Sequence, residues 1–388
     1  MKRHAENHFD VLIIGGGPAG ATAAFIFAGE GYRVAVIEKK RFPRFKLCGG
    51  LLTQKTIELL EDIFDTATSD LKSKGIIHHH SHSYGFGDCN GNFLRAKLAF
   101  PFHFVNRKIY DAYWLDNAVK AGVKVYFEES AENIDISEGK IITRSGRRFA
   151  GRYIIAADGV FSTVKSLLYR RGLLECRRKN YIAAALETAV PRDSIPNPND
   201  YPCIYSGYVP WGYAWSFPGP QYQLLGMCGL KQKVPRSINS CFARFLEDRG
   251  ISPKNCSNPK GYALPYGNYL SNAGYNNILL IGDAGGFADP ILGEGIYYAH
   301  KSAQLAAEAI KQSWRNPVQA HKIYRQLLNE SFITELRCLL MIRRFLFSLP
   351  VQPQSKLLRF MFKTIPHKLE EAVQRKRSFK LLLPESRN

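Results

Sequence analysis

The sequence predicts an α/β protein, α+β overall, whose parallel sheet is assembled from three separated segments of the chain. The first segment, residues 9–38, is a strand, a tight glycine turn, a helix and a second strand. The second contains the buried strand Tyr153 to Ala157, and the third begins with the buried run Asn277 to Asp283. Short β segments rich in proline and tyrosine lie between the second and third segments, which predicts an inserted, mainly antiparallel sheet.

The first turn carries the spacing Gly15-x-Gly17-x-x-Gly20. Gly15 permits the turn, Gly17 lets a pyrophosphate approach the backbone, and Gly20 lets the helix pack closely against the strand. The helix begins at Pro18 and Ala19, and its first amides and positive dipole end attract phosphate. The pattern predicts a Rossmann-like site for an adenine dinucleotide. A glycine-rich turn in an ordinary α/β unit is the alternative.

Glu38 ends the second strand, at about the 20-residue distance that is typical of the acid that accepts both ribose hydroxyls. Its negative charge disfavours a 2′-phosphate at this place. Lys39 follows directly and belongs to the same predicted site. The sequence therefore favours a dinucleotide with an unphosphorylated ribose.

A basic loop follows at residues 39–50, and the pair Gly49 and Gly50 gives it a permissive backbone around Cys48. A thiol among Arg44, Lys46 and glycine amides is a candidate low-pKa cysteine. A small buried thiol is an equally good interpretation of the same residue.

Residues 76–97 predict short strands in a turn-rich segment that belongs to the inserted domain. The segment contains His78, His79, His80 and His82. No cysteine or carboxylate spacing complements these histidines. We therefore expect exposed loop imidazoles and no metal site.

Residues 105–122 predict a helix with Arg107 at its beginning and Asp111 one turn later. Short strands are expected at residues 123–127, 132–136, 140–143 and 147–149. The strand Tyr153 to Ala157 then ends in Asp158 and Gly159, and a helix starts at Ser162.

The inserted domain contains a hairpin-like aromatic segment at residues 209–230, with Trp211, Tyr213, Trp215 and Phe217. Aromatic clusters of this kind are more often core than pocket. Because so many rings lie in this short segment, we nevertheless expect some of them to line a pocket.

Asp283 follows a predicted parallel strand and precedes a glycine-rich loop and a helix, which is typical of a second ligand-facing edge. The returning strand divides the chain. We predict a nucleotide-binding domain of residues 1–75, 98–172 and 272–318, a substrate domain of residues 76–97 and 173–271, and a basic helical C-terminal region of residues 319–388.

Composition limits the class of protein. The 388 residues are 45% hydrophobic, which excludes a disordered or fibrous chain. Eight cysteines are scattered without C-x-x-C pairs, no apolar signal segment begins the chain, and no apolar run reaches the roughly 18 residues of a membrane span. We expect a cytoplasmic, reducing setting and favour a monomer. No nucleic-acid-binding module is present, so we expect no nucleic acid partner.

The formal net charge of +20 requires another explanation. The C-terminal region mixes apolar residues with cations, as in amphipathic helices that lie on an anionic membrane surface. We expect it to hold the protein on the inner face of a membrane; packing helices with a solvated cationic face are the alternative. The cations are Arg337, Arg343, Arg344, Lys356, Arg359, Lys363, Lys368 and the RKR at 375–377.

The three segments together resemble the flavoproteins of the p-hydroxybenzoate hydroxylase fold, and within them the geranylgeranyl reductase family. Gly15, Gly17, Gly20 and Glu38 match the ADP-binding part of that family, and Arg107 matches the arginine of the helix that lines FAD. The family's remaining cofactor motifs are matched by Asp158, Gly159, Gly282, Asp283, Pro290, Gly293, Gly295 and Ile296. The resemblance implies a three-part Rossmann-like FAD-binding domain, an inserted antiparallel β-sheet substrate domain and a helical C-terminus.

Two further motifs resemble the reductase branch: the loop of Cys48, Gly49 and Gly50, and the Y-x-W-x-F-P segment that begins at Tyr213. Flavin halogenases carry W-x-W-x-I-P there. The resemblance implies reduction of carbon–carbon double bonds of an isoprenoid or other apolar small molecule by reduced FAD, with Cys48, Tyr213 and Trp215 as catalytic candidates. A monooxygenase of an aromatic or lipid substrate and a non-enzymatic lipid-binding or electron-carrying flavoprotein are the alternatives. The electron donor, NAD(P)H or ferredoxin, stays open.

Overall fold

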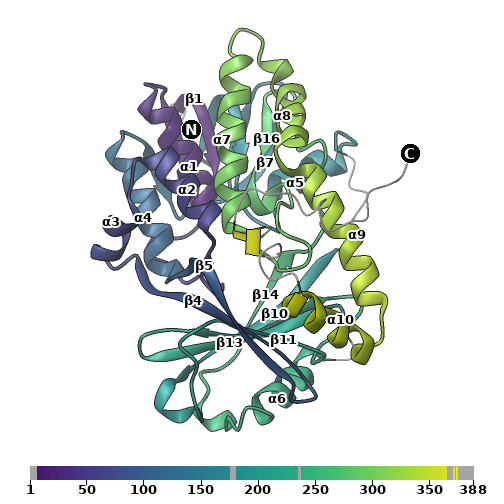
Figure 1. Ribbon diagram of the computed structural model, residues 1–388. Helices are drawn as coiled ribbons and strands as arrows, with labels where there is room; N and C mark the ends of the chain where they lie inside the picture. The colour runs from purple at the N-terminus through teal and green to yellow at the C-terminus, as the bar shows by residue number, and fades with distance from the viewer. Residues whose placement is uncertain (1–6, 175–180, 235–236, 365–369, 372, 375–388) are drawn as a thin grey trace.

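The computed structural model describes residues 7–174, 181–234, 237–364, 370–371 and 373–374. Two eight-stranded sheets form the two halves of the molecule, and most helices surround the first sheet (Figure 1). The prediction of an α/β fold with two sheets and a helical C-terminus is confirmed.

The first sheet is parallel at its centre and is built from three distant segments, as predicted. The strand β1 (Asn7–Ile14) pairs in parallel with β2 (Val34–Glu38) and β9 (Arg148–Ala156). The returning strand β16 (Ile278–Leu280) adds to β9, and β6 (Lys124–Phe127) adds to β2. Every residue of β2 is buried, because helices cover both faces of this part of the sheet.

The helices of the first half are α1 (Pro18–Gly29), α2 (Gln54–Phe64), α3 (Thr68–Ser73), α4 (Arg107–Lys120), α5 (Thr163–Arg170), α7 (Ile296–Gln312) and α8 (Ala320–Leu328). One buried network joins three of them. The His300 imidazole of α7 lies 2.7 Å from the Thr22 hydroxyl of α1 and 2.8 Å from the Tyr110 hydroxyl of α4. Burial lowers the pKa of His300 to about 3, so the imidazole is neutral. The network therefore holds α1, α4 and α7 together through hydrogen bonds between uncharged groups.

The second sheet is the inserted one. Its strands run in the order β14 (Lys260–Pro265), β10 (Ile182–Pro191), β13 (Tyr222–Leu230), β12 (Gly212–Pro218), β11 (Cys203–Ser206), β4 (Ile77–Asp88), β5 (Phe93–Val105) and β3 (Leu51–Leu52). All its neighbouring strands are antiparallel except β11 and β4. The helix α6 (Ile238–Glu247) packs on one face, through Phe242 and Phe245.

Three local predictions differ from the structure. Residues 76–97 are not short strands with turns, because β4 and β5 form one long hairpin that continues to Val105 and places residues 98–105 in the second sheet. Two register shifts, at His79 and Ser83, break the apolar alternation and hide the length of β4. The four histidines therefore lie on a strand and not in a loop. The segments 147–149 and 153–157 are likewise one strand, β9.

The C-terminal region is helical in its described part, as predicted. Its main helices are α9 (Thr334–Ser348) and α10 (Val351–Thr364), and α9 runs from the first half of the molecule to the second (Figure 1). Arg343 is fully buried, so its predicted place on a cationic surface is wrong. Lys368 and the RKR at 375–377 lie outside the described residues. In the part of the chain that the structure describes, no helix combines the length and the apolarity that a membrane span requires.

Candidate functional site

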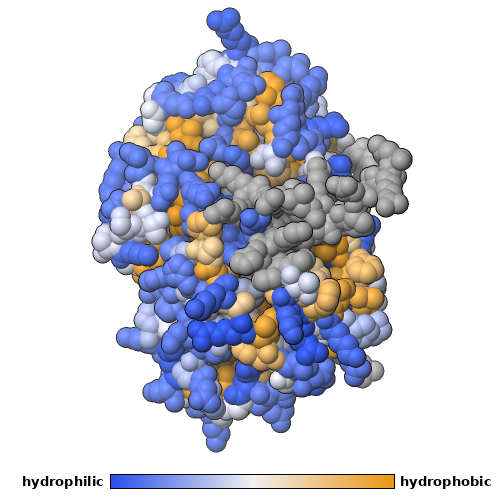
Figure 2. All heavy atoms as spheres, in the orientation of Figure 1, coloured by the Kyte–Doolittle hydropathy of each residue, from blue (hydrophilic) through white to orange (hydrophobic). Residues whose placement is uncertain are grey.

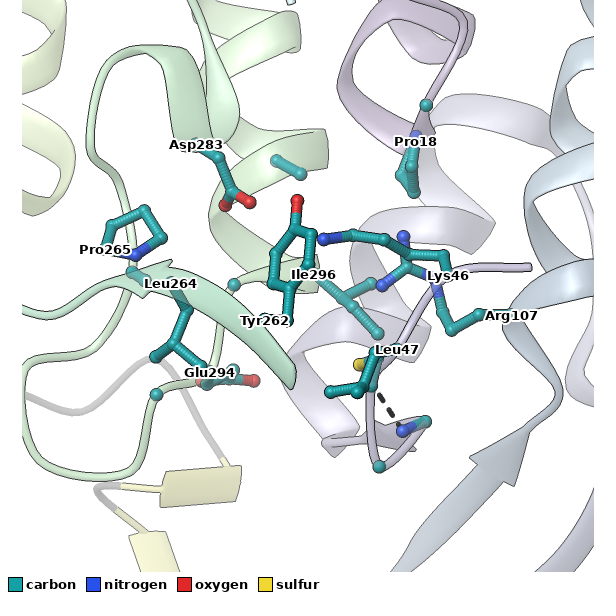
Figure 3. Close-up of a pocket in the computed structure, with 18 of the residues that line it drawn as sticks. Pro18, Lys46, Leu47, Arg107, Tyr262, Leu264, Pro265, Asp283, Glu294 and Ile296 are labelled. Atoms are coloured by element: carbon teal, nitrogen blue, oxygen red, sulfur yellow. Dashed lines mark hydrogen bonds between the residues drawn. The ribbon is translucent and has the colours of Figure 1, made fainter. Parts of the chain in front are cut away.

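A cavity of about 870 Å³ lies between the two sheets. The glycine loop, the basic loop of residues 39–50 and the start of α7 line one part, and side chains of the second sheet line another. Figure 3 shows how Lys46, Arg107, Tyr262 and Asp283 converge on this space from four different segments of the chain.

Most of the predicted site residues line this one cavity. They are Gly15, Gly17, Pro18, Ala19, Glu38, Lys39, Cys48, Gly49, Gly50, Arg107, Asp158, Gly159, Tyr213, Trp215, Asp283, Gly293, Gly295 and Ile296. Gly20, Gly282 and Pro290 do not line it. Gly20 packs against the turn, and Gly282 lies against Ala19. Pro290 contributes its carbonyl to a hydrogen bond behind the cavity wall.

The fold requires glycine at two positions of the first turn, Gly15 and Gly20, whereas at Gly17 the space beside the backbone is open. Gly15 has φ +101°, and a side chain on it would meet the Ala157 carbonyl at 2.4 Å. A Cβ on Gly20 would lie 1.9 Å from the Gly15 carbonyl, so α1 packs on the turn only without a side chain. On Gly17 a Cβ would meet nothing nearer than Arg44 Nη2 at 3.5 Å. The space over Gly17 is therefore available to a phosphate.

Glu38 holds the far side of the turn. Its Oε2 accepts from the Gly16 amide at 2.7 Å and its Oε1 from the Lys40 amide at 2.9 Å. Each oxygen of an ionised carboxylate retains a second acceptor site. The buried Glu38 side chain therefore has the capacity, the position and the charge to accept ribose hydroxyls, as the sequence predicts.

Asp111 organises the cations of the site. Its fully buried carboxylate accepts from Arg107 at 2.6 and 3.0 Å and lies 3.2 Å from Arg44. Burial by itself would lower the pKa of Arg107, but the Asp111 carboxylate more than offsets it, and the pKa lies above its ordinary value. One carboxylate between two guanidinium groups leaves a net positive charge at the cavity, which suits a phosphate or an anionic ring.

Lys46 is a further cation of the cavity, and its contact with an aromatic ring could not be predicted from the sequence. Its Nζ lies 3.2 Å from the centre of the Tyr262 ring, over the ring face (Figure 3). Burial lowers its pKa to about 8, although Asp283 on the opposite wall opposes that shift. Tyr262 is a lining residue that the sequence analysis missed, because its strand carries no motif.

Asp158 carries an unused acceptor. Its Oδ2 accepts from the Thr163 amide at 2.7 Å at the start of α5, whereas its buried Oδ1 has no hydrogen-bond partner among the described residues. Burial raises the pKa of Asp158. An unpaired buried oxygen at a cavity wall is satisfied when a ligand hydroxyl is bound, which fits a ribose or ribityl chain.

The Cys48 loop approaches the cavity because its glycines have no side chains. A Cβ on Gly49 would lie 2.5 Å from the Phe217 ring, and one on Gly50 would lie 2.0 Å from the Val105 carbonyl. The Cys48 sulfur accepts from the Gly50 amide at 3.4 Å, and the Arg107 side chain lies beside the thiol. The geometry thus places a thiol next to a cation at the cavity.

The aromatic side chains of β12 separate into lining and packing residues. Tyr213, Trp215 and Phe217 share one face of the strand and line the cavity, whereas Trp211 packs near Phe347 of α9. A Cβ on the neighbouring Gly226 would lie 2.2 Å from the Trp215 ring, so the indole occupies the space that a side chain at Gly226 would need. The Tyr213 hydroxyl donates to the Leu292 carbonyl, and burial raises its pKa well above the ordinary value. This proton is engaged in holding a loop, which weakens Tyr213 as a proton donor.

Two acids at or near the cavity carry no sequence signal: Glu294, which is half-buried, and Glu187, which is buried. Glu294 binds Lys55 at 2.6 Å and Thr53 at 2.7 Å, and therefore ties α2 to the loop before α7. Glu187 of β10 faces the Cys48 amide and the Trp215 indole, and burial raises its pKa to about 7. Glu187 lies on a strand without a motif, so no sequence signal indicates it. Glu294 lies between the motif residues Gly293 and Gly295, but their spacing does not indicate a role for the side chain between them.

Comparison with known proteins agrees with this site. Residues 8–192 match the FAD binding domain family. The fold and the site define the protein as an FAD-dependent oxidoreductase. The chain belongs to the geranylgeranyl reductase family of these enzymes, as the resemblance implied.

Three relatives and one solved structure document the similarity. The chain is 30% identical over 349 residues to an uncharacterised protein of Methanosarcina barkeri, covering 87% of this chain and 84% of that protein. It is 27% identical over 316 residues to a digeranylgeranylglycerophospholipid reductase of Methanocella arvoryzae (79% and 78% covered). It is 29% identical over 334 residues to a tryptophan 2-halogenase of Chondromyces crocatus (78% and 60% covered). A geranylgeranyl bacteriochlorophyll reductase-like protein of Thermoplasma acidophilum shares the fold, with a TM-score of 0.80 at 22% identity and 97% and 99% covered.

Proposed function

We propose that the protein reduces carbon–carbon double bonds in a long isoprenoid chain. The observation that carries this proposal is the apolar wall of the cavity beyond the dinucleotide site. Trp215 and Phe217 begin it, and five further apolar residues continue it: Phe86, Leu98, Phe102, Ile204 and Phe362. Such a wall buries an extended hydrocarbon and offers few polar groups to a compact polar substrate.

Different residues of the chain bind the cofactor, hold the substrate and donate the proton. Arg44, Arg107 and Glu38 bind and orient the dinucleotide, and Trp215 and Phe217 hold the apolar chain beside it. When bound and reduced, FAD supplies hydride from N5 of its ring. An isolated alkene accepts hydride poorly, so a weak acid must protonate the other carbon. Cys48 is the proposed donor, because its thiol lies at the junction of the two parts of the cavity.

The names of the relatives support the reductase over its competitors. A digeranylgeranylglycerophospholipid reductase and a geranylgeranyl diphosphate reductase are 27% and 26% identical to the chain. The tryptophan 2-halogenase is similarly close, but Tyr213 and Phe217 stand where the halogenase motif has tryptophan and isoleucine. NAD(P)H or a ferredoxin is the proposed source of electrons.

Products formed in air and under argon distinguish the reductase from a monooxygenase. The chemically reduced holoprotein is mixed with a geranylgeranyl lipid, and the products are weighed by mass spectrometry. A reductase adds two hydrogen atoms per double bond in both atmospheres. An oxygenated product that forms only in air would replace the proposal by the monooxygenase. Cys48→Ser should keep FAD and lose most turnover, whereas Cys89→Ser, which alters a cysteine away from the cavity, should keep both.

The outer face of α9 and α10 is the proposed contact with an anionic membrane. Four apolar side chains are strongly exposed there: Met341, Phe345, Val351 and Phe360. Arg337, Arg344 and Lys356 lie on the same helices. Figure 2 shows hydrophobic side chains at the surface along this side of the molecule. Exposed rings between cations are typical of helices that lie in a lipid interface, and a lipid substrate has to enter from such a surface.

A further inference from the structure

The turn Asp289–Gly293 precedes α7 and is built around one buried side chain. Asp289 Oδ1 accepts from the amides of Ile291 at 2.6 Å and Leu292 at 2.8 Å. The Asp289 carbonyl accepts from the Gly293 amide at 3.0 Å. The amides of Ile291, Leu292 and Gly293 are therefore satisfied within the turn itself, and the carbonyls of Pro290, Ile291 and Leu292 are left for other partners.

Three consecutive carbonyls of the turn receive side-chain donors from three different elements. Arg343 of α9 donates to Pro290 at 3.2 Å. Tyr266, which follows β14, donates its hydroxyl to Ile291 at 2.8 Å. Tyr213 of β12 donates its hydroxyl to Leu292. A C-terminal helix and two parts of the second sheet thus meet on one short turn of the first domain.

Arg343 is the most informative of the three donors. Its side chain is fully buried, and no carboxylate pairs with it within the described residues. The Tyr181 and Tyr266 rings flank the guanidinium at 4.9 and 4.7 Å, and it also donates to the Tyr266 carbonyl. Burying a cation without a carboxylate is costly, and an apolar side chain of similar length would fill the space without that cost. The guanidinium is therefore explained by the carbonyls that it binds.

We infer that Arg343, Tyr266 and Tyr213 are positioning residues that fix the turn before α7 and thereby the flavin-facing end of that helix. Leu292, which carries the last of the three bound carbonyls, lines the cavity, and so do Gly293 and Gly295 just after it. Fixing these peptide groups orients the first amides of α7, whose positive dipole end favours negative charge on a bound flavin ring. The inference depends on FAD binding and not on the proposed isoprenoid substrate.

The test measures release of FAD from the purified holoprotein, by flavin fluorescence after dilution, together with the visible absorption bands of the bound flavin. Tyr266→Phe and Tyr213→Phe keep the rings and remove one hydroxyl each. Loss of one buried hydrogen bond should speed release about five-fold in each variant. In the double variant the rate of FAD release should rise by less than the product of the two single increases, because both hydroxyls act on the same turn. In all three variants the flavin bands should shift.

Arg343→Met should speed release more strongly, because one residue serves both the turn and Tyr266. Arg344→Met is the matched control: Arg344 is the exposed neighbour that donates to the Tyr181 hydroxyl at 2.7 Å, and its loss should leave FAD release and spectrum unchanged. If Arg343→Met fails to fold, the two tyrosine variants decide. Unchanged release and spectra in both tyrosine variants, at preserved thermal stability, would overturn the inference.

Discussion

The Glu38 carboxylate lies 2.7 Å from the Gly16 amide, so the end of β2 and the glycine turn after β1 form one unit. The same carboxylate lines the cavity, where we expect it to accept from the ribose hydroxyls of FAD. We therefore expect one side chain both to hold the turn and to bind the cofactor.

Glu38→Arg should reduce the FAD content of the purified protein severely, because arginine has no acceptor for the Gly16 amide or for ribose hydroxyls. Flavin absorbance relative to protein measures this. The control is Glu138→Arg, which makes the same charge change at an exposed acid that is near Lys140 and away from the cavity. Normal flavin content in Glu38→Arg would remove Glu38 from the cofactor site.

Lys46 should make FAD affinity depend on pH. Its pKa is lowered to about 8, so its charge is present below that pH and is lost as the pH rises through it. Loss of a cation beside the dinucleotide should weaken binding of the anionic cofactor, and FAD release should therefore accelerate between about pH 7 and pH 9. Lys46→Arg keeps the charge over this range and should flatten the profile. A wild-type profile that is flat, or that slopes the other way, would contradict this role.

Membrane attachment through α9 and α10 should depend on exposed rings as well as on charge. Phe345→Glu with Phe360→Glu replaces two side chains that are 64% and 63% exposed, and should abolish flotation with anionic liposomes. Ile109→Glu, at an exposed position of α4, should float like the wild type. Flotation should also fade with salt, since each basic residue near the surface contributes about 1 kcal/mol. Equal flotation of the two variants would refute this membrane surface.

The parts of the site that sequence predicts well are those with local requirements. Gly15 must adopt a positive φ, and Gly20 must carry no side chain, whatever the rest of the chain does. The strand before Asp283 could be recognised because a buried parallel strand that ends in an acid and glycines has a distinct pattern.

The parts that sequence predicts badly depend on distant partners. The sequence predicts Arg343 at the surface, because an arginine in an amphipathic helix usually lies there. Its partners are the backbone carbonyls of Tyr266 and Pro290, which leave no pattern in the sequence. The role of Tyr213 is similar, since the Leu292 carbonyl that engages its hydroxyl is 79 residues away in the chain.

The contribution of α10 to the cavity wall could also not be predicted from the sequence. Phe362 of α10 stacks on Phe86 of β4, with ring centres 4.8 Å apart, and both line the cavity. The C-terminal region thus contributes to the site as well as to the surface. Strand bulges and long-range packing of this kind are decided by the tertiary fold, and hydrophobic periodicity alone does not indicate them.

The most direct test of the proposed reaction follows the bound flavin itself. The holoprotein is reduced with dithionite in the absence of oxygen, mixed with a geranylgeranyl lipid, and monitored at the flavin absorption bands. We expect the oxidised flavin spectrum to return, with one double bond lost from the lipid for each flavin reoxidised. A flavin that stays reduced beside an unchanged lipid, and that reoxidises only when air is admitted, would contradict it.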